Sequence, residues 1–204
     1  MHPDTLTPSG GSLFYLMGAS GAGKDSLINY ARAALGGAAG VVFAHRYITR
    51  PPGTGGENHV ALAPAEFELR RRHGLFLFDW RSHGNRYGIG IEVDVWLRRG
   101  LHVVVNGSRE YLPVARRRVA CLTPVLVRVS DQRLRERLLV RGREINAALH
   151  SRIARGIEHA VIDTPGLRVV DNEGSLEAAG ECLLAMLREV AARPEGRRLA
   201  DGGG

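Results

Sequence analysis

Cysteine, aromatic residues and long apolar runs are all scarce in this sequence of 204 residues. The two cysteines, Cys121 and Cys182, are too few for a disulfide framework and lack the spacing of a metal site, so we expect a cytoplasmic protein. Aromatic residues make up 6% of the chain and do not alternate with basic ones, which argues against nucleic-acid binding. No run of about 18 apolar residues predicts a membrane span. Residues 1–11 lack the apolar segment of a secretory signal, and we expect them to be flexible.

Lysine is almost absent as well. The chain has 28 basic and 21 acidic residues, which gives a net charge of +7, and Lys24 is its one lysine. Arginine carries a planar, delocalised charge and lysine a compact one, so a retained lysine predicts a site that needs a point charge. The excess of positive charge predicts a polyanionic partner, either nucleic acid or a phosphorylated small molecule.

Short apolar segments alternate with amphipathic segments along most of the chain, which is typical of an α/β sandwich on a mainly parallel sheet. One domain is expected over 12–192, followed by a disordered tail at 193–204. We expect a turn region at 83–90, a helix interrupted early by Pro113, and a helix capped by Asp131. The expected strands are 12–17, 41–44, 75–80, 101–105, 123–129 and 167–170, and the expected helices are 25–35, 65–73, 92–99, 109–118, 132–141, 147–159 and 175–192.

A glycine-rich loop between the first strand and the first helix matches the phosphate-binding pattern G-x4-G-K. Its backbone N–H groups and the following helix N-terminus favour phosphate, and Lys24 can reach the β- and γ-phosphates. Asp25 follows where Ser or Thr is usual, so it is expected to contact Mg²⁺ with Ser26, or else to be a helix residue favoured by the dipole. The expected nucleotide-binding residues are Gly18, Ala19, Ser20, Gly21, Ala22, Gly23, Lys24, Asp25 and Ser26.

From about Ser12 to Ala192 the chain resembles the guanylate kinase branch of the P-loop nucleoside monophosphate kinases. The resemblance implies a three-layer P-loop sandwich with an acceptor-binding insert at about 45–90 and a small mobile lid at about 137–155. It implies that Arg50 and Tyr87 bind the acceptor phosphate. Gly53 stands where the family usually has a second arginine for this phosphate, and Arg46 lies near enough in the sequence to substitute for it. The lid arginines that would neutralise the transferring phosphoryl group are Arg141 and Arg152, and Arg137, one helical turn before Arg141, would contact the nucleotide.

The guanine-contacting residues of that family do not match. Phe78 lies at or beside the position of a glutamate, and Ile89 replaces a Ser or Thr. Val104-Val105-Asn106-Gly107 replaces a segment with paired acids. Guanine needs acceptors for its N–H groups, so the site is expected to hold an acceptor phosphate without recognising guanine.

Longer strings resemble the ribose 1,5-bisphosphate phosphokinases of phosphonate catabolism. These are Gly23-Lys24-Asp25-Ser26-Leu27, 44–50, Glu57-Asn58-His59, Tyr87-Gly88-Ile89-Gly90 and 105–109. The resemblance implies transfer of the ATP γ-phosphoryl group to the 1-phosphate of ribose 1,5-bisphosphate, with Mg²⁺. Ribose hydroxyls would then be held by Asn106, Asn58 and Glu57, and adenine would lie near Asn172. The expected contacts of the 5-phosphate are one or more of Arg46, His59, Arg86 and Arg109.

Three other functions stay open. The chain could be a guanylate kinase with altered base contacts, a non-catalytic module of that fold, or a nucleic-acid binder drawn to polyanions by its charge. Non-catalytic modules typically lose the P-loop lysine and the lid arginines, which this chain keeps. We therefore expect ATP and a phosphorylated sugar as partners, no nucleic acid, no membrane, and a monomer or homodimer.

Overall fold

The structure is a computed structural model that describes residues 10–36, 40–51, 59–140 and 164–192. The expected helix at 147–159, the lid residues Arg141 and Arg152, and Glu57 and Asn58 lie outside the described residues, as do most of the N-terminal segment and the tail.

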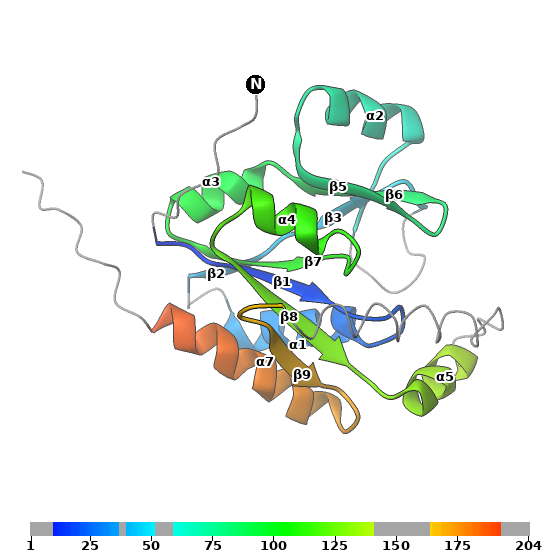
Figure 1. Ribbon diagram of the computed structural model, residues 1–204, viewed down its shortest axis with the longest axis vertical. Coiled ribbons are helices and arrows are strands. Elements are labelled where there is room, and N and C mark those ends of the chain that lie inside the picture. The colour runs from blue at the N-terminus through cyan, green and yellow to red at the C-terminus, as the bar shows by residue number, and fades with distance from the viewer. Residues whose placement is uncertain (1–9, 37–39, 52–58, 141–163, 193–204) are drawn as a thin grey trace, which may run out of the picture.

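A five-stranded parallel sheet forms the centre of the molecule (Figure 1). Its order is β2-β7-β1-β8-β9, and every neighbouring pair is parallel. All five residues of β1 are buried, because helices cover both faces of the sheet and leave no face for polar side chains. The strands are β1 Leu13–Met17, β2 Val41–Phe43, β7 His102–Asn106, β8 Leu122–Arg128 and β9 Arg168–Asp171.

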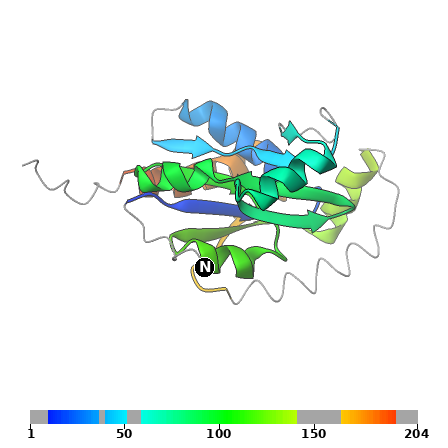
Figure 2. The same cartoon turned by 90° about the horizontal axis from the view of Figure 1, so that it is seen from above.

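Helices cover the sheet on both sides, and α1 and α4 lie on opposite sides of β1 when the molecule is seen from above (Figure 2). Phe14 and Leu16 belong to the core beneath α1 and α7, whereas Leu13, Tyr15 and Met17 belong to the core beneath α3 and α4. This is the two-residue alternation of a strand. The helices are α1 Lys24–Leu35, α7 Leu176–Ala191, α3 Glu92–Arg98 and α4 Leu112–Arg118.

A second, four-stranded sheet lies beside the first and has the order β4-β3-β6-β5. Strand β6 pairs antiparallel with β3 on one edge and with β5 on the other. Helix α2, Pro64–Arg72, packs on this sheet through Phe67, whose ring stacks on Phe76 at 4.6 Å. The strands are β3 Arg46–Ile48, β4 Val60–Ala61, β5 Phe76–Ser82 and β6 Asn85–Gly90.

The expectation of a turn region at 83–90 is wrong for most of that range, because Asn85–Gly90 forms strand β6. Only His83 and Gly84 turn the chain, with φ of +47° and +75°. Two successive left-handed residues make the tight connection that suits an antiparallel hairpin. The two glycines of β6 lower its strand propensity, but pairing on both edges outweighs that effect. The short strands β3 and β4 were likewise not expected.

Two expectations about helix ends are also wrong. Pro113 does not interrupt a helix, because α4 begins at Leu112 and the proline lies in its first turn, where no N–H donor is needed. Asp131 lies inside α5, Asp131–Val140, and the cap is Ser130, whose Oγ accepts from the Arg133 N–H at 3.2 Å. The other expected elements among the described residues lie within two residues of those observed.

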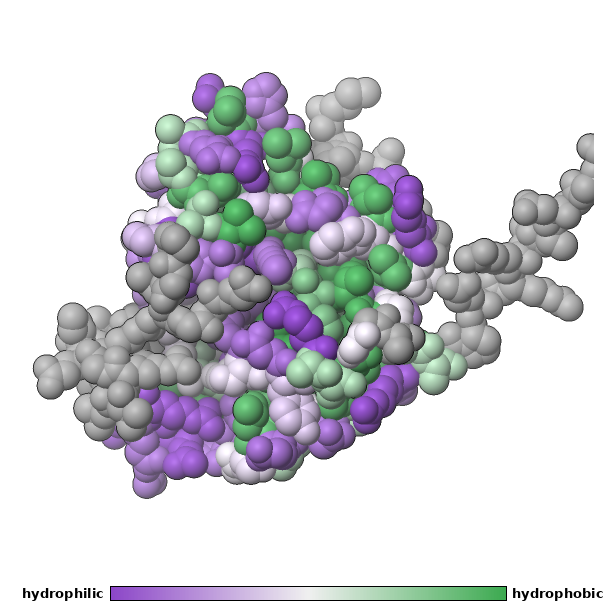
Figure 3. All heavy atoms as spheres, turned by 180° about the vertical axis from the view of Figure 1, so that it is seen from behind, coloured by the Kyte–Doolittle hydropathy of each residue, from purple (hydrophilic) through white to green (hydrophobic). Residues whose placement is uncertain are grey.

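The surface mixes residue types. On the face opposite to that of Figure 1, hydrophilic and hydrophobic side chains are interspersed (Figure 3). The large exposed hydrophobic residues come from different elements, including Leu69 of α2, Val95 of α3 and Val169 of β9. In the described part of the chain, every helix is too short or too polar to cross a bilayer.

Candidate active site

The candidate site lies at the carboxyl ends of the parallel strands, where open α/β sheets bind ligands. The glycine-rich loop follows β1, Asn106 is the last residue of β7, and Asn172 follows β9. The sheet order makes β1 a neighbour of both β7 and β8, so groups far apart in the sequence meet around one loop.

The loop has the conformation that its glycines allow. Gly23 has φ of +94°, and a Cβ there would lie 2.4 Å from Asn172 Nδ2. Lys24 Nζ donates to the carbonyl oxygens of Gly18 and Ala19, both at 3.0 Å, and so lies across the loop it is expected to serve. The loop residues and Lys24 are therefore placed as the sequence predicts.

Two side chains hold the loop from outside. The buried Asn172 donates from Nδ2 to the Ala22 carbonyl at 2.7 Å. Arg137 donates to the same carbonyl at 3.3 Å and to the Asn172 carbonyl at 2.8 Å. Both residues were expected to contact the nucleotide, and the structure adds that they fix the phosphate loop.

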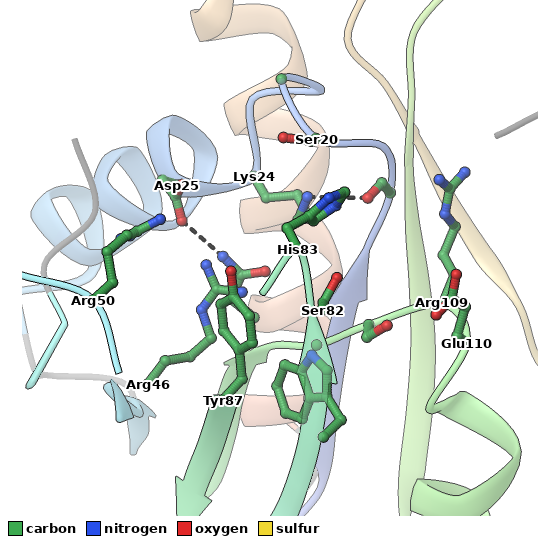
Figure 4. A pocket seen from close by; sticks show the side chains of 16 residues that line it. Ser20, Lys24, Asp25, Arg46, Arg50, Ser82, His83, Tyr87, Arg109 and Glu110 are labelled. Carbon is green, nitrogen blue, oxygen red and sulfur yellow. Dashed lines mark hydrogen bonds between the residues drawn. The ribbon is translucent and has the colours of Figure 1, made fainter. Parts of the chain in front are cut away.

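A cavity of about 190 Å³ opens beside the loop (Figure 4). It brings together residues that the sequence predicts, namely Lys24, Asp25, Arg46, Arg50, Tyr87, Asn106 and Arg109. It also contains Trp80, Ser82, His83, Ser108 and Glu110, which sequence reasoning missed. A signal existed for two of these, because Phe78, Trp80 and Ser82 alternate on one face of β5.

Aromatic rings form one wall of this cavity. The buried Tyr87 stacks on Trp80, with ring centroids 5.5 Å apart and an interplanar angle of 8°. The Arg46 guanidinium lies 5.2 Å from the centre of the Tyr87 ring. These contacts restrain the tyrosine hydroxyl and the guanidinium together at the cavity.

Asp25 and Asn106 form a hydrogen-bonded pair, in which Asn106 Nδ2 donates to Asp25 Oδ1 at 2.7 Å. A carboxylate accepts only, so the Asn106 nitrogen must face it and the amide oxygen faces away. Asn106 is 4% exposed, and its Oδ1 has no hydrogen-bond partner among the described residues. A buried acceptor that lines a cavity is suited to a hydroxyl of a bound molecule.

The segment after β7 is fixed by Tyr15, whose hydroxyl donates to the Ser108 carbonyl and accepts from the Ser108 N–H, both at 2.9 Å. Burial raises the pKa of Tyr15, so the hydroxyl stays protonated. Gly107 is required beside it, because a Cβ there would lie 2.1 Å from the Tyr15 ring. The backbone that carries Arg109 is therefore rigidly placed.

A second hollow of about 500 Å³ lies beyond the loop and is lined by Ser26, Arg133, Arg137, Asn172 and Leu176, among others. Ser26 and Asp25, expected together at the metal, line different hollows. In the described part of the chain, no three His, Cys, Asp or Glu residues gather to hold a metal. A metal here would need the oxygens of a bound phosphate besides the Asp25 carboxylate.

Two candidates for a substrate phosphate lie elsewhere. His59 Nε2 is 3.3 Å from the Arg50 carbonyl, and His59 is not among the residues lining the 190 Å³ cavity. Arg86 pairs with Glu68 beside a different hollow, which Arg71, Asp79 and Arg81 also line.

Comparison with curated proteins gives one class of relatives. The chain is 52% identical over 184 residues to the ribose 1,5-bisphosphate phosphokinase PhnN of Thiobacillus denitrificans, covering 90% of this chain and 96% of the relative. Proteins of the same name from Psychromonas ingrahamii and Desulfomicrobium baculatum are 47% and 51% identical, covering 91% and 87% of this chain and 94% and 95% of the relatives. No family model matches the chain.

A similar solved structure is the guanylate kinase of Anaplasma phagocytophilum, with a TM-score of 0.63 and 18% identity. The match covers 93% of this chain and 90% of that one. At this identity the likeness concerns the fold, and it agrees with the architecture expected from the sequence.

Proposed function

The chain belongs to the ribose 1,5-bisphosphate phosphokinase family, and from that premise we propose that it makes 5-phospho-α-D-ribose 1-diphosphate in phosphonate degradation. The phosphoryl donor is ATP and the acceptor is ribose 1,5-bisphosphate. The observation that carries the proposal is the cavity itself, which Lys24 of a phosphate loop lines together with Arg46, Arg50 and Tyr87.

The chemistry needs no general base, because an oxygen of the acceptor 1-phosphate is already anionic. That oxygen forms a bond to the γ-phosphorus while the bond from the γ-phosphorus to the β,γ-bridging oxygen breaks, and ADP leaves. The protein must bring two polyanions together and neutralise their charge, so catalysis rests on positioning and electrostatics.

The residue roles follow from this division. The N–H groups of 19–24 and the Lys24 ammonium bind the ATP phosphates, while Arg137 and Asn172 keep the loop in shape. Arg50, Arg46 and Tyr87 bind the acceptor 1-phosphate. We assign the closing charges over the γ-phosphoryl group to Arg141 and Arg152, and further ribose contacts to Glu57 and Asn58.

Asp25 fits a Mg²⁺ role through its second carboxylate oxygen, because Oδ1 is held by Asn106. Mg²⁺ is commonly bound through one or two carboxylates together with substrate phosphates. When bound it would offset the charge of the β- and γ-phosphates. Ser26 lines the other hollow, so we give it a secondary role at the metal.

The acceptor is a sugar phosphate because the cavity offers a hydroxyl acceptor in place of guanine contacts. Phe78 and Ile89, which stand where guanylate kinases hold the base, are buried in the hydrophobic core with no exposed surface. Asn106 Oδ1 accepts instead from a ribose hydroxyl. A site built for hydroxyls leaves the guanine N–H donors unpaired, which disfavours GMP.

We further place the reaction in the cytoplasm, where ATP is available and where Cys121 and Cys182, both free thiols, stay reduced. ATP, Mg²⁺ and the sugar bisphosphate are the proposed ligands of a monomer or homodimer.

The test is ATP consumption by the purified chain with Mg²⁺ and either ribose 1,5-bisphosphate or GMP as acceptor. We expect turnover with the sugar bisphosphate and little with GMP. Efficient use of GMP alone would assign the chain to the guanylate kinases. No ATP consumption with either acceptor, in a chain that binds ATP, would make it a non-catalytic module.

A further inference from the structure

The proposed acceptor carries two phosphates, and Arg46, Arg50 and Tyr87 account for only one. We propose that Arg109, assisted by Ser82 and His83, forms a second anion subsite that binds the 5-phosphate and thereby selects a bisphosphorylated sugar. This inference rests on the proposed function and names a specificity determinant of the same cavity.

The two sets of positive charge lie on opposite flanks of the cavity. Figure 4 shows Arg46, Arg50 and Tyr87 on one flank and Arg109 on the other, with His83 between them. A sugar with phosphates at both ends requires this separation. Two phosphates held at fixed points also fix the direction of the ribose ring between them.

The other cations near the cavity are placed for other contacts. Lys24 lies across the ATP loop, and Arg46 stacks on Tyr87 in the wall assigned to the 1-phosphate. Arg86 pairs with Glu68 beside a different hollow, and Arg118 donates to the Leu77 carbonyl at 2.7 Å. Of the arginines that line the cavity, Arg109 is the one outside the flank assigned to the acceptor 1-phosphate.

The fold presents Arg109 on a fixed support. The buried Tyr15 hydroxyl holds both backbone groups of Ser108, the neighbouring residue. The Gly107 N–H donates to the Leu16 carbonyl of β1 at 2.7 Å. An arginine carried on restrained backbone loses less conformational freedom when its planar fork binds a phosphate.

Two other hydrogen-bond donors line the same cavity and are assigned to the subsite. Ser82 supplies a hydroxyl at the end of β5, and His83 stands at the hairpin tip with φ of +47°, a backbone conformation that is uncommon for residues other than glycine. Glu110, an exposed residue, also lines this flank.

The experiment compares two acceptors, ribose 1,5-bisphosphate and ribose 1-phosphate, in the natural chain and in Arg109→Ala. We expect the natural chain to prefer the bisphosphate, because loss of a charge-assisted contact costs about 10- to 100-fold in kcat/KM. Arg109→Ala should lose about that factor on the bisphosphate and almost nothing on the monophosphate. Its KM for ATP should not change.

Two further variants sharpen the result. Arg109→Lys keeps the charge without the bidentate fork, so its kcat/KM on the bisphosphate should lie between those of the natural chain and Arg109→Ala. Arg117→Ala removes the same charge from an exposed position on α4 and should leave both acceptors unaffected. An equal loss on both acceptors, or a raised KM for ATP, would overturn the assignment.

Equilibrium binding separates this inference from the proposed function. If the natural chain binds the bisphosphate better than the monophosphate, and loses that preference in Arg109→Ala, but consumes no ATP, the subsite stands and the proposed reaction fails. If the natural chain turns over the bisphosphate and Arg109→Ala keeps the preference, the reaction stands and the subsite is refuted.

Discussion

At the scale of single residues, the site separates charges that must be mobile from groups that must be fixed. Lys24 contacts two carbonyl oxygens of its own loop, so its ammonium can exchange them for phosphate oxygens. Asp25 and Asn106 instead hold each other directly. Substitutions at these positions should therefore fail in different ways.

Lys24→Ala should remain folded and lose at least about 100-fold in kcat, because the charge stabilises phosphate oxygens during transfer. Lys24→Arg should also be impaired, since a planar guanidinium does not replace a compact ammonium. Steady-state kinetics and the thermal unfolding midpoint check both effects. A near-natural kcat in the alanine variant would refute the role of the loop.

Asp25→Asn should raise the Mg²⁺ concentration needed for half-maximal rate by at least about tenfold, because it removes the carboxylate. Asn106→Ala is the matched variant, since it breaks the same hydrogen bond and keeps the carboxylate. It should raise the acceptor KM and leave the Mg²⁺ requirement unchanged. If Asp25→Asn changes only the acceptor KM, Asp25 positions Asn106 and does not hold the metal.

At the scale of elements, long-range hydrogen bonds and ion pairs hold the cavity walls. The segment after β7 depends on Tyr15 of β1, and the β5–β6 hairpin depends on Glu68 of α2. Helix α2 reaches the hairpin because its Phe67 packs into the second sheet.

Tyr15→Phe should lower the free energy of unfolding by about 1–3 kcal/mol, because it removes the hydrogen-bond partner of two partly buried backbone groups of Ser108. It should also raise the acceptor KM, since the support of Arg109 loosens. Tyr30→Phe is the control, because its hydroxyl bonds Glu181 at the exposed surface and should cost less than about 0.5 kcal/mol. Denaturant unfolding measures the difference, and equal losses would contradict the role given to Tyr15.

Glu68→Gln should destabilise the protein at neutral pH but not in acid. Hydrogen bonds from Arg71 and then Arg86 lower the pKa of Glu68 from 4.5 to about 2. A lowered folded-state pKa gives stability that is present above pH 4.5 and is lost as pH falls from there toward 2. The difference in unfolding midpoint between natural chain and variant should shrink over that interval.

Glu66→Gln is the control for this titration, because it breaks only an exposed i,i+4 pair with Arg70 inside α2. Its effect on the unfolding midpoint should be small at every pH. A Glu68→Gln difference that persists unchanged at the lowest pH would show that the ion pair does not stabilise the hairpin.

At the scale of the whole molecule, a net charge of +7 attracts polyanions without selecting them. Retention on immobilised DNA should fall steeply between about 50 and 200 mM salt, as expected for displaced counterions. The acceptor KM should rise less over this range, because Arg46, Arg50 and Tyr87 are at least partly buried and partly buried charges are screened less by salt. Retention that resists salt would indicate a nucleic-acid site of another kind.

The sequence alone determined the central architecture and the nucleotide loop. Apolar runs such as 101–105 make strands because they can be buried on both faces, and the loop at 18–24 follows from local glycine chemistry. The motifs predict site roles for five further residues, and the structure brings them to one cavity, namely Arg46, Arg50, Tyr87, Asn106 and Arg109.

Only the tertiary structure decided how distant groups meet. Strand β6 forms despite weak propensity because it is paired on both edges, and it carries Tyr87 to Trp80 of β5. The Asp25–Asn106 pair joins the first turn of α1 to the last residue of β7, and the two residues are 81 positions apart in sequence. Local patterns fix what each segment can become, but contacts across the sheet depend on strand order, which no local pattern encodes.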